Sequence, residues 1–244
     1  MLSLRHPYIS VQLQSGNSYG GGQQFSPNAM VRRCGCGIVA ATDLLLYLSK
    51  YHLQEPLAPF AALLREDPLP FSAYNDCILW MNRHYFPMIP YNGINGLMLM
   101  AGMQKFFHDY RLPYTSRWCM AQSRLWERLE GMLREDLPVI LAVGPNFPIV
   151  WGDKRVHFYR KTADGKYKPA SGAKAHFFTV TGSDESWVRI SSWGRMYYLN
   201  RWEFRDYARK SSIGFVNNAL LIERKWGCLK IQPRKKRTIT AAVP

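Results

Sequence analysis

A helix that is apolar on every side most constrains the fold of this chain. Residues 37–51 read GIVAATDLLLYLSKY, and only Asp43 and Lys50 carry a charge. A helix at the surface of a domain keeps one polar face, so a helix without such a face must be covered by other elements all round. We therefore predict that this helix lies in the interior of a domain, with Asp43 held in a buried polar contact.

The rest of the chain is large enough to surround such a helix. The sequence has 244 residues, 47% of them hydrophobic and 14% aromatic, which suffices for a packed domain. Its longest apolar run falls short of the roughly 18–20 residues that cross a bilayer, and its first residues lack the apolar core of an export signal. The five cysteines form an odd set without the spacing of a disulfide scaffold. We therefore predict a soluble cytoplasmic protein with no membrane span.

Hydrophobic patterns divide the chain into two halves. After the central helix, the sequence predicts helices at 58–64, 73–85 and 96–110, which prolines separate from one another. Together with the central helix they make a helical half at about 36–110. An extended segment at 8–13 precedes this half. Further on, the sequence predicts helices at 123–135 and 201–210 and strands at 114–120, 137–143, 156–160, 175–181, 187–191, 196–200 and 212–224. We expect an α+β fold in a single domain, residues 1–224, whose sheet half covers about 111–224.

A basic tail follows this domain at 225–244. The net charge of the chain is +15, and one stretch without any acid carries Arg224, Lys225, Lys230, Arg234, Lys235, Lys236 and Arg237. Such a stretch is typical of a solvated terminus, and it also suits an anionic partner such as nucleic acid, anionic lipid or an acidic peptide. Nothing in the sequence indicates readout of bases.

Two cysteines stand at the start of the central helix. Cys34-Gly35-Cys36-Gly37 leads directly into it, and the N-terminus of a helix favours a thiolate through its dipole and its free N–H groups. His176 lies 140 residues after Cys36, inside the separation of about 130–150 residues found in one large class of thiol proteases. The pair Cys34 and Cys36 could hold half of a zinc site, but no second Cys/His pair has suitable spacing. We therefore predict thiol chemistry, without a metal or another cofactor.

Three motifs carry a resemblance to a known family. Residues 28–43 read NAMVRRCGCGIVAATD, residues 175–182 read AHFFTVTG and residues 190–194 read ISSWG. In this order they resemble the papain-like cysteine peptidase superfamily in the broad sense. The chain is most similar there to uncharacterised bacterial papain-like proteins and more distantly to bacteriocin-leader peptidases. The similarity covers roughly residues 17–50 and 174–200.

The resemblance implies a fold and a set of catalytic roles. In that family the central buried helix carries the Cys and packs against an antiparallel β-sheet carrying the His. The resemblance makes Cys36 the nucleophile, with Cys34 as the competing assignment, and it makes His176 the base. The residue that orients the base precedes Ser-Trp-Gly and is an Asn or Asp in the family, and Ser191 stands at this position. Trp193 is expected to pack against the His.

The oxyanion donor of the family does not map directly onto this chain. The family has a Gln six residues before its Cys, where this sequence has Met30. The resemblance therefore leaves Gln23 and Asn28 as candidates, if the loop before the helix folds back toward the thiol. His157 is the one rival base, but no Ser-Trp-Gly follows it.

These residues predict a cysteine peptidase or related thiol hydrolase. Cys36 would attack an amide bond in a peptide or protein substrate, and the same apparatus would serve isopeptide cleavage or acyl transfer. The alternative is a catalytically inactive member of the fold that binds a peptide or another partner. It follows from Ser191, because a Ser hydroxyl carries no charge to favour an imidazolium.

Overall fold

The computed structural model describes residues 1–120, 122–149 and 151–225. The protein is an α+β molecule with a large antiparallel sheet and several helices. The tail from 226 onward, which holds most of the basic residues named above as well as Cys228, lies outside the described residues.

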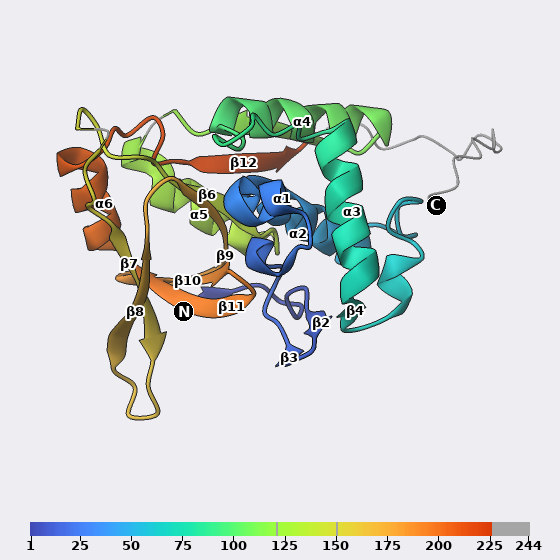
Figure 1. Ribbon diagram of the computed structural model, residues 1–244, viewed down its shortest axis with the longest axis horizontal. Coiled ribbons are helices and arrows are strands. Elements are labelled where there is room, and N and C mark those ends of the chain that lie inside the picture. The colour runs from blue at the N-terminus through green and yellow to red at the C-terminus, as the bar shows by residue number, and fades with distance from the viewer. Residues whose placement is uncertain (121, 150, 226–244) are drawn as a thin grey trace.

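The apolar helix is the centre of the molecule. It forms α2 (Cys36–Tyr51), and every residue from Gly37 to Ser49 in it is buried. It contacts α3 (Phe71–His84) and α4 (Gly96–Asp109) as well as strands β6 (Val139–Val143) and β9 (His176–Ser183), as Figure 1 shows. The predicted interior helix is therefore confirmed. Among the described residues, no helix is both long and apolar enough to cross a membrane.

The large sheet supplies the other half of the core. Its strand order is β5-β12-β6-β9-β10-β11-β7-β8, and β1 (Leu2–Ser3) pairs with β9 in addition. The strands not yet introduced are β5 (Tyr114–Trp118), β7 (Val156–Lys161), β8 (Tyr167–Ala173), β10 (Trp187–Ser192), β11 (Arg195–Asn200) and β12 (Ala219–Arg224). Each neighbouring pair is antiparallel.

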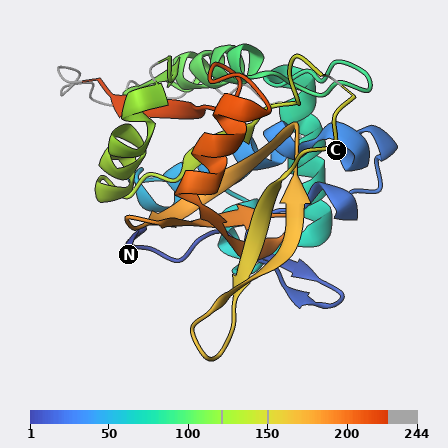
Figure 2. The same cartoon turned by 90° about the vertical axis from the view of Figure 1, so that its left-hand side faces the viewer.

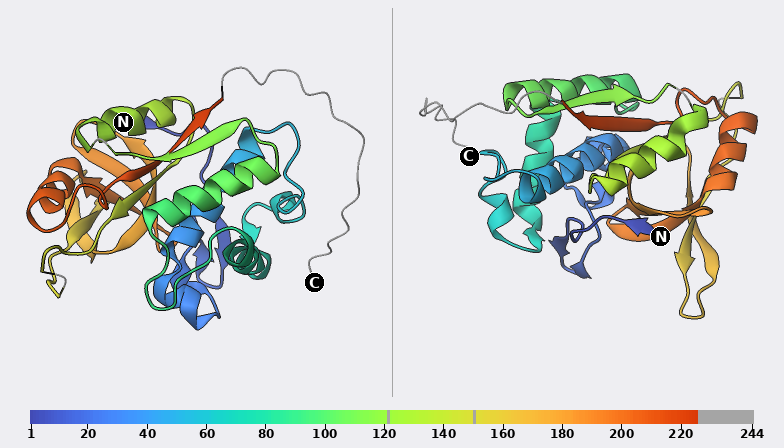
Figure 3. Two further views of the ribbon diagram at one scale, coloured as in Figure 1. Left: turned by 90° about the horizontal axis from the view of Figure 1, so that it is seen from above. Right: turned by 180° about the vertical axis from the view of Figure 1, so that it is seen from behind.

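Two helices pack on this sheet away from α2. Helix α5 (Leu125–Arg134) contacts β12, β6 and β9, and α6 (Arg201–Lys210) contacts β11 and β7. The right-hand view of Figure 3 shows both helices from behind. The bounds of α6 match the prediction, and α5 is shorter than predicted by two residues at its N-terminal end and by one at its C-terminal end.

The hairpin of β7 and β8 projects from the body of the molecule (Figures 1 and 2). Strand β8 was not predicted, because Ser171-Gly172 has the composition of a turn. In the structure both residues are paired within the ladder, opposite Phe158 and His157. The turn lies at Asp164-Gly165, the other turn signal in this stretch of the sequence, and the φ of +81° at Gly165 suits a residue without Cβ.

The N-terminal arm is more structured than predicted. It contains β2 (Val11–Leu13) and β3 (Gly16–Asn17), which form a small sheet with β4 (Leu69–Pro70) from beyond α2. A 3-10 turn η1 (Gln23–Phe25) and the unpredicted helix α1 (Ala29–Cys34) follow in the arm. The helix predicted at 58–64 is wrong, since the only helical element there is a second 3-10 turn, η2 (Leu63–Arg65).

The last predicted strand begins later than expected. Residues 212–218 form a turn before β12, and side chains hold this turn closed. Asn217 Nδ2 donates to the Ile213 carbonyl at 2.8 Å, and Asn218 Nδ2 donates to the Gly214 carbonyl at 3.2 Å. Such bonds from Asn to nearby backbone compete with strand pairing.

Candidate active site

Cys36 is the first residue of the buried helix. Helix α1 ends at Cys34, Gly35 caps α2, and Cys36 opens it. A Cβ on Gly37 would lie 2.3 Å from Ile94 and 3.2 Å from Phe177, so this glycine allows close packing of both side chains. The backbone amides of Phe177 and Gly37 interact with the Cys36 thiol at this point.

His176 is the first residue of β9 and lies beside Cys36 in two cavities. The larger cavity, which we call the cleft, has a volume of about 870 Å³, and the smaller, the inner chamber, about 20 Å³. Cys36, His176 and Gln23 line both. The fold thus brings together the predicted nucleophile and the predicted base across 140 residues of sequence. Among the described residues, no hydrogen bond joins the thiol to the imidazole.

Trp193 covers the imidazole, as expected. The two rings are stacked, with centroids 4.5 Å apart and an interplanar angle of 21°. His176 is only 8% exposed as a result. Trp193 has a φ of +51°, and Gly194 after it has a φ of +68°, so a sharp turn after β10 positions the indole on the ring.

The serine that contacts the imidazole is Ser192, which corrects the prediction for Ser191. His176 Nε2 lies 2.8 Å from Ser192 Oγ, whereas Ser191 Oγ donates to the Tyr19 carbonyl at 2.7 Å. Ser191 lies opposite Thr179 in the ladder of β9 and β10. Thr179 is an odd number of residues from His176, and alternate residues of a strand point to opposite faces. Ser191 therefore lies on the other face of the ladder from His176; it lines the inner chamber, but its hydroxyl is bonded to Tyr19 and not to the imidazole.

A β-bulge causes this exchange of the two serines. The register of β9 and β10 shifts between Arg189 and Ile190. Before the shift, Arg189 is opposite Gly182. If the register continued unchanged, Ser191 would be opposite Val180 and would lie on the same face of the sheet as His176. One extra residue in β9 inverts the faces, as a bulge does.

Ser191 instead fixes the glycine-rich arm that leads to Gln23. Its bond to Tyr19 anchors the residue before Gly20-Gly21-Gly22. The Gly21 amide donates to Asp43 Oδ2 at 2.8 Å, and Tyr74 OH donates to Asp43 Oδ1 at 2.6 Å. The predicted buried polar contact of Asp43 is therefore confirmed. A Cβ on Gly20 would lie 2.2 Å from Ser191 Oγ, so the arm can approach this closely only with glycine.

The two candidate oxyanion donors have different positions. Asn28 is the N-cap of α1, where its side-chain oxygen accepts from the amides of Met30 and Val31 at 3.0 and 3.1 Å. It lines neither cavity, so the prediction for Asn28 is wrong: its side chain satisfies free N–H groups of a helix that the sequence pattern did not predict. Gln23 does line both cavities, and its Nε2 donates to the Arg32 carbonyl at 3.1 Å. Its Oε1 is buried without a hydrogen-bond partner among the described residues.

Burial keeps the Cys36 thiol and the His176 imidazole neutral at pH 7. It raises the pKa of the Cys36 thiol, although the backbone amides of Phe177 and Gly37 oppose this effect. It also lowers the pKa of His176 to about 3. The expected thiolate is thus not the resting form, because desolvation outweighs the hydrogen bonds from the backbone amides. The pKa of Asp43 is raised to about 6, again by burial, with hydrogen bonds from Tyr74 and Gly21 acting in the opposite direction.

The remaining candidates lie apart from this pair. Cys34 lines the cleft but not the inner chamber, and its thiol donates to the Met30 carbonyl at 3.2 Å. His157 lines neither cavity, and its Nδ1 lies 2.5 Å from Glu203 Oε1. Within the described ranges, no three residues among His, Cys, Asp and Glu are grouped so that they could hold a metal ion.

Sequence reasoning missed Ser192 and the anchoring of the glycine arm. The signal for the arm was the run Gly20-Gly21-Gly22. A Cβ on any of these three glycines would clash with a nearby side chain, so each position requires glycine. The chain matches no protein-family description, no curated protein and no solved structure.

Proposed function

We propose that the protein is a papain-like thiol hydrolase that cleaves a peptide or isopeptide bond, with Cys36 as nucleophile and His176 as general base. One observation carries this proposal: the thiol at the start of the buried helix and the imidazole at the start of β9 line the same cleft and the same inner chamber. The packing of the Cys-bearing helix against the His-bearing antiparallel strand supports the papain-like assignment.

His176 has the hydrogen bond that a general base needs. If Nε2 carries the proton and donates to Ser192 Oγ, Nδ1 keeps its lone pair for the Cys36 proton. We assign Ser192 the orienting role that the motif gave to Ser191. Because the thiol starts neutral, its proton moves to the imidazole as sulfur attacks the carbonyl carbon. The imidazolium then protonates the leaving amine, and water hydrolyses the thioester.

The oxyanion has one backbone donor in place and one side-chain donor that must turn. The Cys36 amide lies in the first turn of α2, where amides have no carbonyl partner within the helix, and would be the backbone donor. Gln23 presents a buried oxygen without a partner, and a rotation of its amide by about 180° exchanges oxygen and nitrogen. This rotation gives up the bond from Nε2 to the Arg32 carbonyl. A developing negative charge on the substrate oxygen would favour the turned amide.

The test is cleavage of a peptide mixture, followed by mass spectrometry. Cys36→Ala should abolish all products that the wild-type chain forms, because the proposed thioester forms on the Cys36 sulfur. Cys34→Ser is the matched control, two residues away at the edge of the same cleft, and should retain cleavage. Loss of products with Cys34→Ser and their persistence with Cys36→Ala would exchange the two assignments. Products that survive both substitutions would refute thiol catalysis.

A second candidate is an inactive fold that binds peptide in the cleft. It is favoured by the lowered pKa of His176 and by its partner Ser192, which has no charge to stabilise an imidazolium. Incubation of the wild-type chain with a peptide mixture separates the two functions. Retention of intact peptides, with no products after days, supports the binding module; product formation that depends on Cys36 supports the hydrolase.

A further inference from the structure

The walls of the cleft carry positive charge without a matching negative charge. Three cationic residues line it, Arg33, Arg155 and Lys174, and no Asp or Glu is among its described lining residues. Cys36 and His176, which line the same cleft, are both neutral at pH 7. A ligand in the cleft therefore meets fixed charge of only one sign.

Arg33 is the charge on the helical side of the cleft. It comes from α1, one residue before Cys34, and its guanidinium lies over the Tyr91 ring at 5.0 Å from the centroid. In the described part of the chain it forms no ion pair. Its neighbour Arg32 differs, because its Nη1 donates to the carbonyls of Ser26 and Pro27 at 2.9 and 2.7 Å. Arg32 thus has backbone partners, whereas Arg33 keeps its donors for a ligand.

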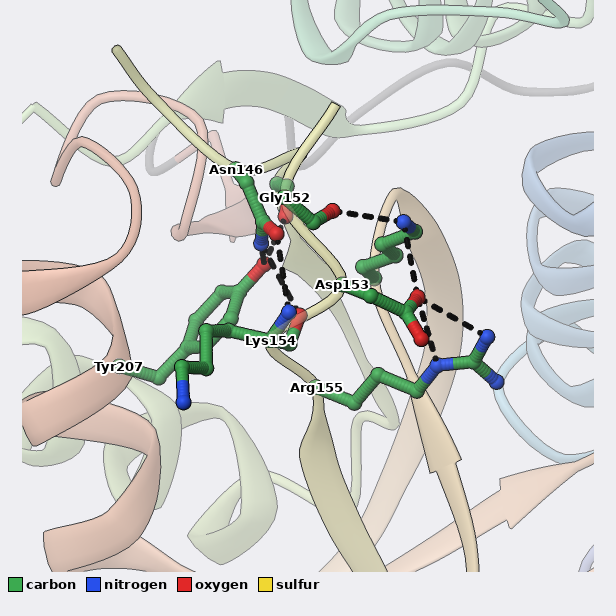
Figure 4. A network of polar contacts seen from close by, with 8 residues as sticks. Asn146, Gly152, Asp153, Lys154, Arg155 and Tyr207 are labelled. Carbon is green, nitrogen blue, oxygen red and sulfur yellow. Dashed lines mark hydrogen bonds and ion pairs between the residues drawn. The ribbon is translucent and has the colours of Figure 1, made fainter. Parts of the chain in front are cut away.

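Lys174 and Arg155 form the charge on the sheet side. Both pair with one carboxylate, Asp153, at 3.0 and 3.1 Å, and Lys174 Nζ also donates to the Gly152 carbonyl at 2.7 Å. Figure 4 shows the contact between Asp153 and Arg155. Two cations therefore share one anion on this wall, and Asp153 does not line the cleft.

The segment that carries Asp153 and Arg155 is held in place from its other side. Asn146 Nδ2 donates to the Lys154 carbonyl and to Tyr207 OH, both at 2.9 Å, and the Lys154 amide donates back to Asn146 Oδ1 at 3.0 Å. Figure 4 shows this network next to the ion pairs. Because Asn146 is buried and satisfied, it holds the backbone at Lys154, between the two charged residues Asp153 and Arg155.

We infer that the cleft selects an acidic peptide, in which one carboxylate binds Arg33 and another binds Lys174 and Arg155. This inference rests on the proposed function for the identity of the ligand as a peptide substrate. A guanidinium on an aromatic ring presents its N–H edge to a carboxylate, which suits Arg33 to this role. Arg33 and Lys174 are specificity-determining residues, and neither takes part in bond cleavage.

The test compares charge reversals with a matched control. Arg33→Glu and Lys174→Glu change the cleft, and Arg83→Glu makes the same change at an exposed position on α3 outside it. A synthetic peptide library with equal numbers of acidic, neutral and basic members is cleaved by each variant. We expect the wild-type chain and Arg83→Glu to prefer acidic members. Arg33→Glu should lower kcat/KM for these members about tenfold and raise it for basic ones.

A binding measurement separates failure of this inference from failure of the proposed function. Fluorescein-labelled peptides of alternating Glu and Ala, or of Lys and Ala, are titrated into the Cys36→Ala variant with and without Arg33→Glu. Tighter binding of the Glu peptide that weakens with Arg33→Glu and with added salt supports the inference even if nothing is cleaved. Cleavage without preference for acidic members, or binding of both peptides with equal affinity, would overturn the inference and leave the hydrolase proposal standing. Neither cleavage nor binding would overturn both.

Discussion

Two histidines on strands of the same sheet have opposite surroundings. His157 on β7 lies at the surface, with Glu203 Oε1 2.5 Å from its Nδ1. His176 on β9 is buried beside the thiol, and its hydrogen-bond partner is the neutral hydroxyl of Ser192. The histidine with a carboxylate has no nucleophile, and the histidine with a nucleophile has no carboxylate. If His176 is the base, as we propose, a cavity shared with a thiol identifies it and a charged partner does not.

The largest expected effect on the rate of cleavage comes from removing the imidazole of His176, with removal of the His157 imidazole as the comparison. His176→Gln should lower the rate of peptide cleavage by about 10⁴-fold, because the neutral thiol loses its proton acceptor. His157→Gln should change the rate less than twofold, because His157 does not line the cleft. Steady-state kinetics on one cleaved peptide measures both. If His157→Gln lost activity and His176→Gln kept it, the assignment of the base would be reversed.

The next effect is on stability at acid pH. The pKa of His176 is lowered from 6.5 to about 3, so the unfolded chain takes up this proton first as the pH falls below 6.5. The wild-type chain should therefore lose roughly 3 kcal/mol relative to His176→Gln between pH 6.5 and 4.5. Urea unfolding at several pH values measures the difference. Parallel curves for the two proteins would mean that His176 is not held neutral by burial.

Asp43 should have the opposite effect on stability over much of the same pH range. Its pKa is raised from 3.8 to about 6, so the folded chain takes up this proton first and gains stability as the pH falls from 6 to 4. Replacement by Asn removes this gain, which is about 3 kcal/mol, and should leave the variant more sensitive to acid than the wild type. The same unfolding series decides the sign. An Asp43→Asn chain that resists acid better than the wild type would contradict it.

The contrast between the serines also shows where sequence-based prediction ends. The motif and the spacing of Cys36 and His176 sufficed to place both residues in one cleft, and the apolar pattern sufficed for α2. The choice between Ser191 and Ser192 depends on the bulge in β9, and a pattern of alternating residues does not reveal a single extra residue. Asn28 failed for a related reason, since its role depends on a short helix with little periodicity.

A smaller effect is expected from giving His176 the kind of partner that His157 has. Ser192→Asp places a carboxylate next to Nε2, which should raise the pKa of His176 and stabilise an ion pair with the Cys36 thiolate. We expect alkylation of Cys36 by iodoacetamide at pH 6 to become about tenfold faster. Peptide mapping by mass spectrometry follows Cys36 separately, and Ser191→Asp is the matched control because Ser191 also lines the inner chamber but has no hydrogen bond to the imidazole. Equal acceleration by both substitutions would contradict the assignment of Ser192.

The smallest effect concerns the partner of His157. Glu203 accepts from the His157 amide at 2.9 Å and from Tyr159 OH at 2.8 Å, and it lies in the first turn of α6, where a negative charge is favourable. Glu203→Gln should therefore cost about 1 kcal/mol, a fall in Tm of roughly 2–4 °C for a chain of this size, and leave peptide cleavage unchanged. Calorimetry measures the first effect, with the exposed Glu185→Gln as control. If the folded Glu203→Gln chain lost cleavage, the His157–Glu203 pair would take part in activity, and the contrast between His157 and His176 would be wrong.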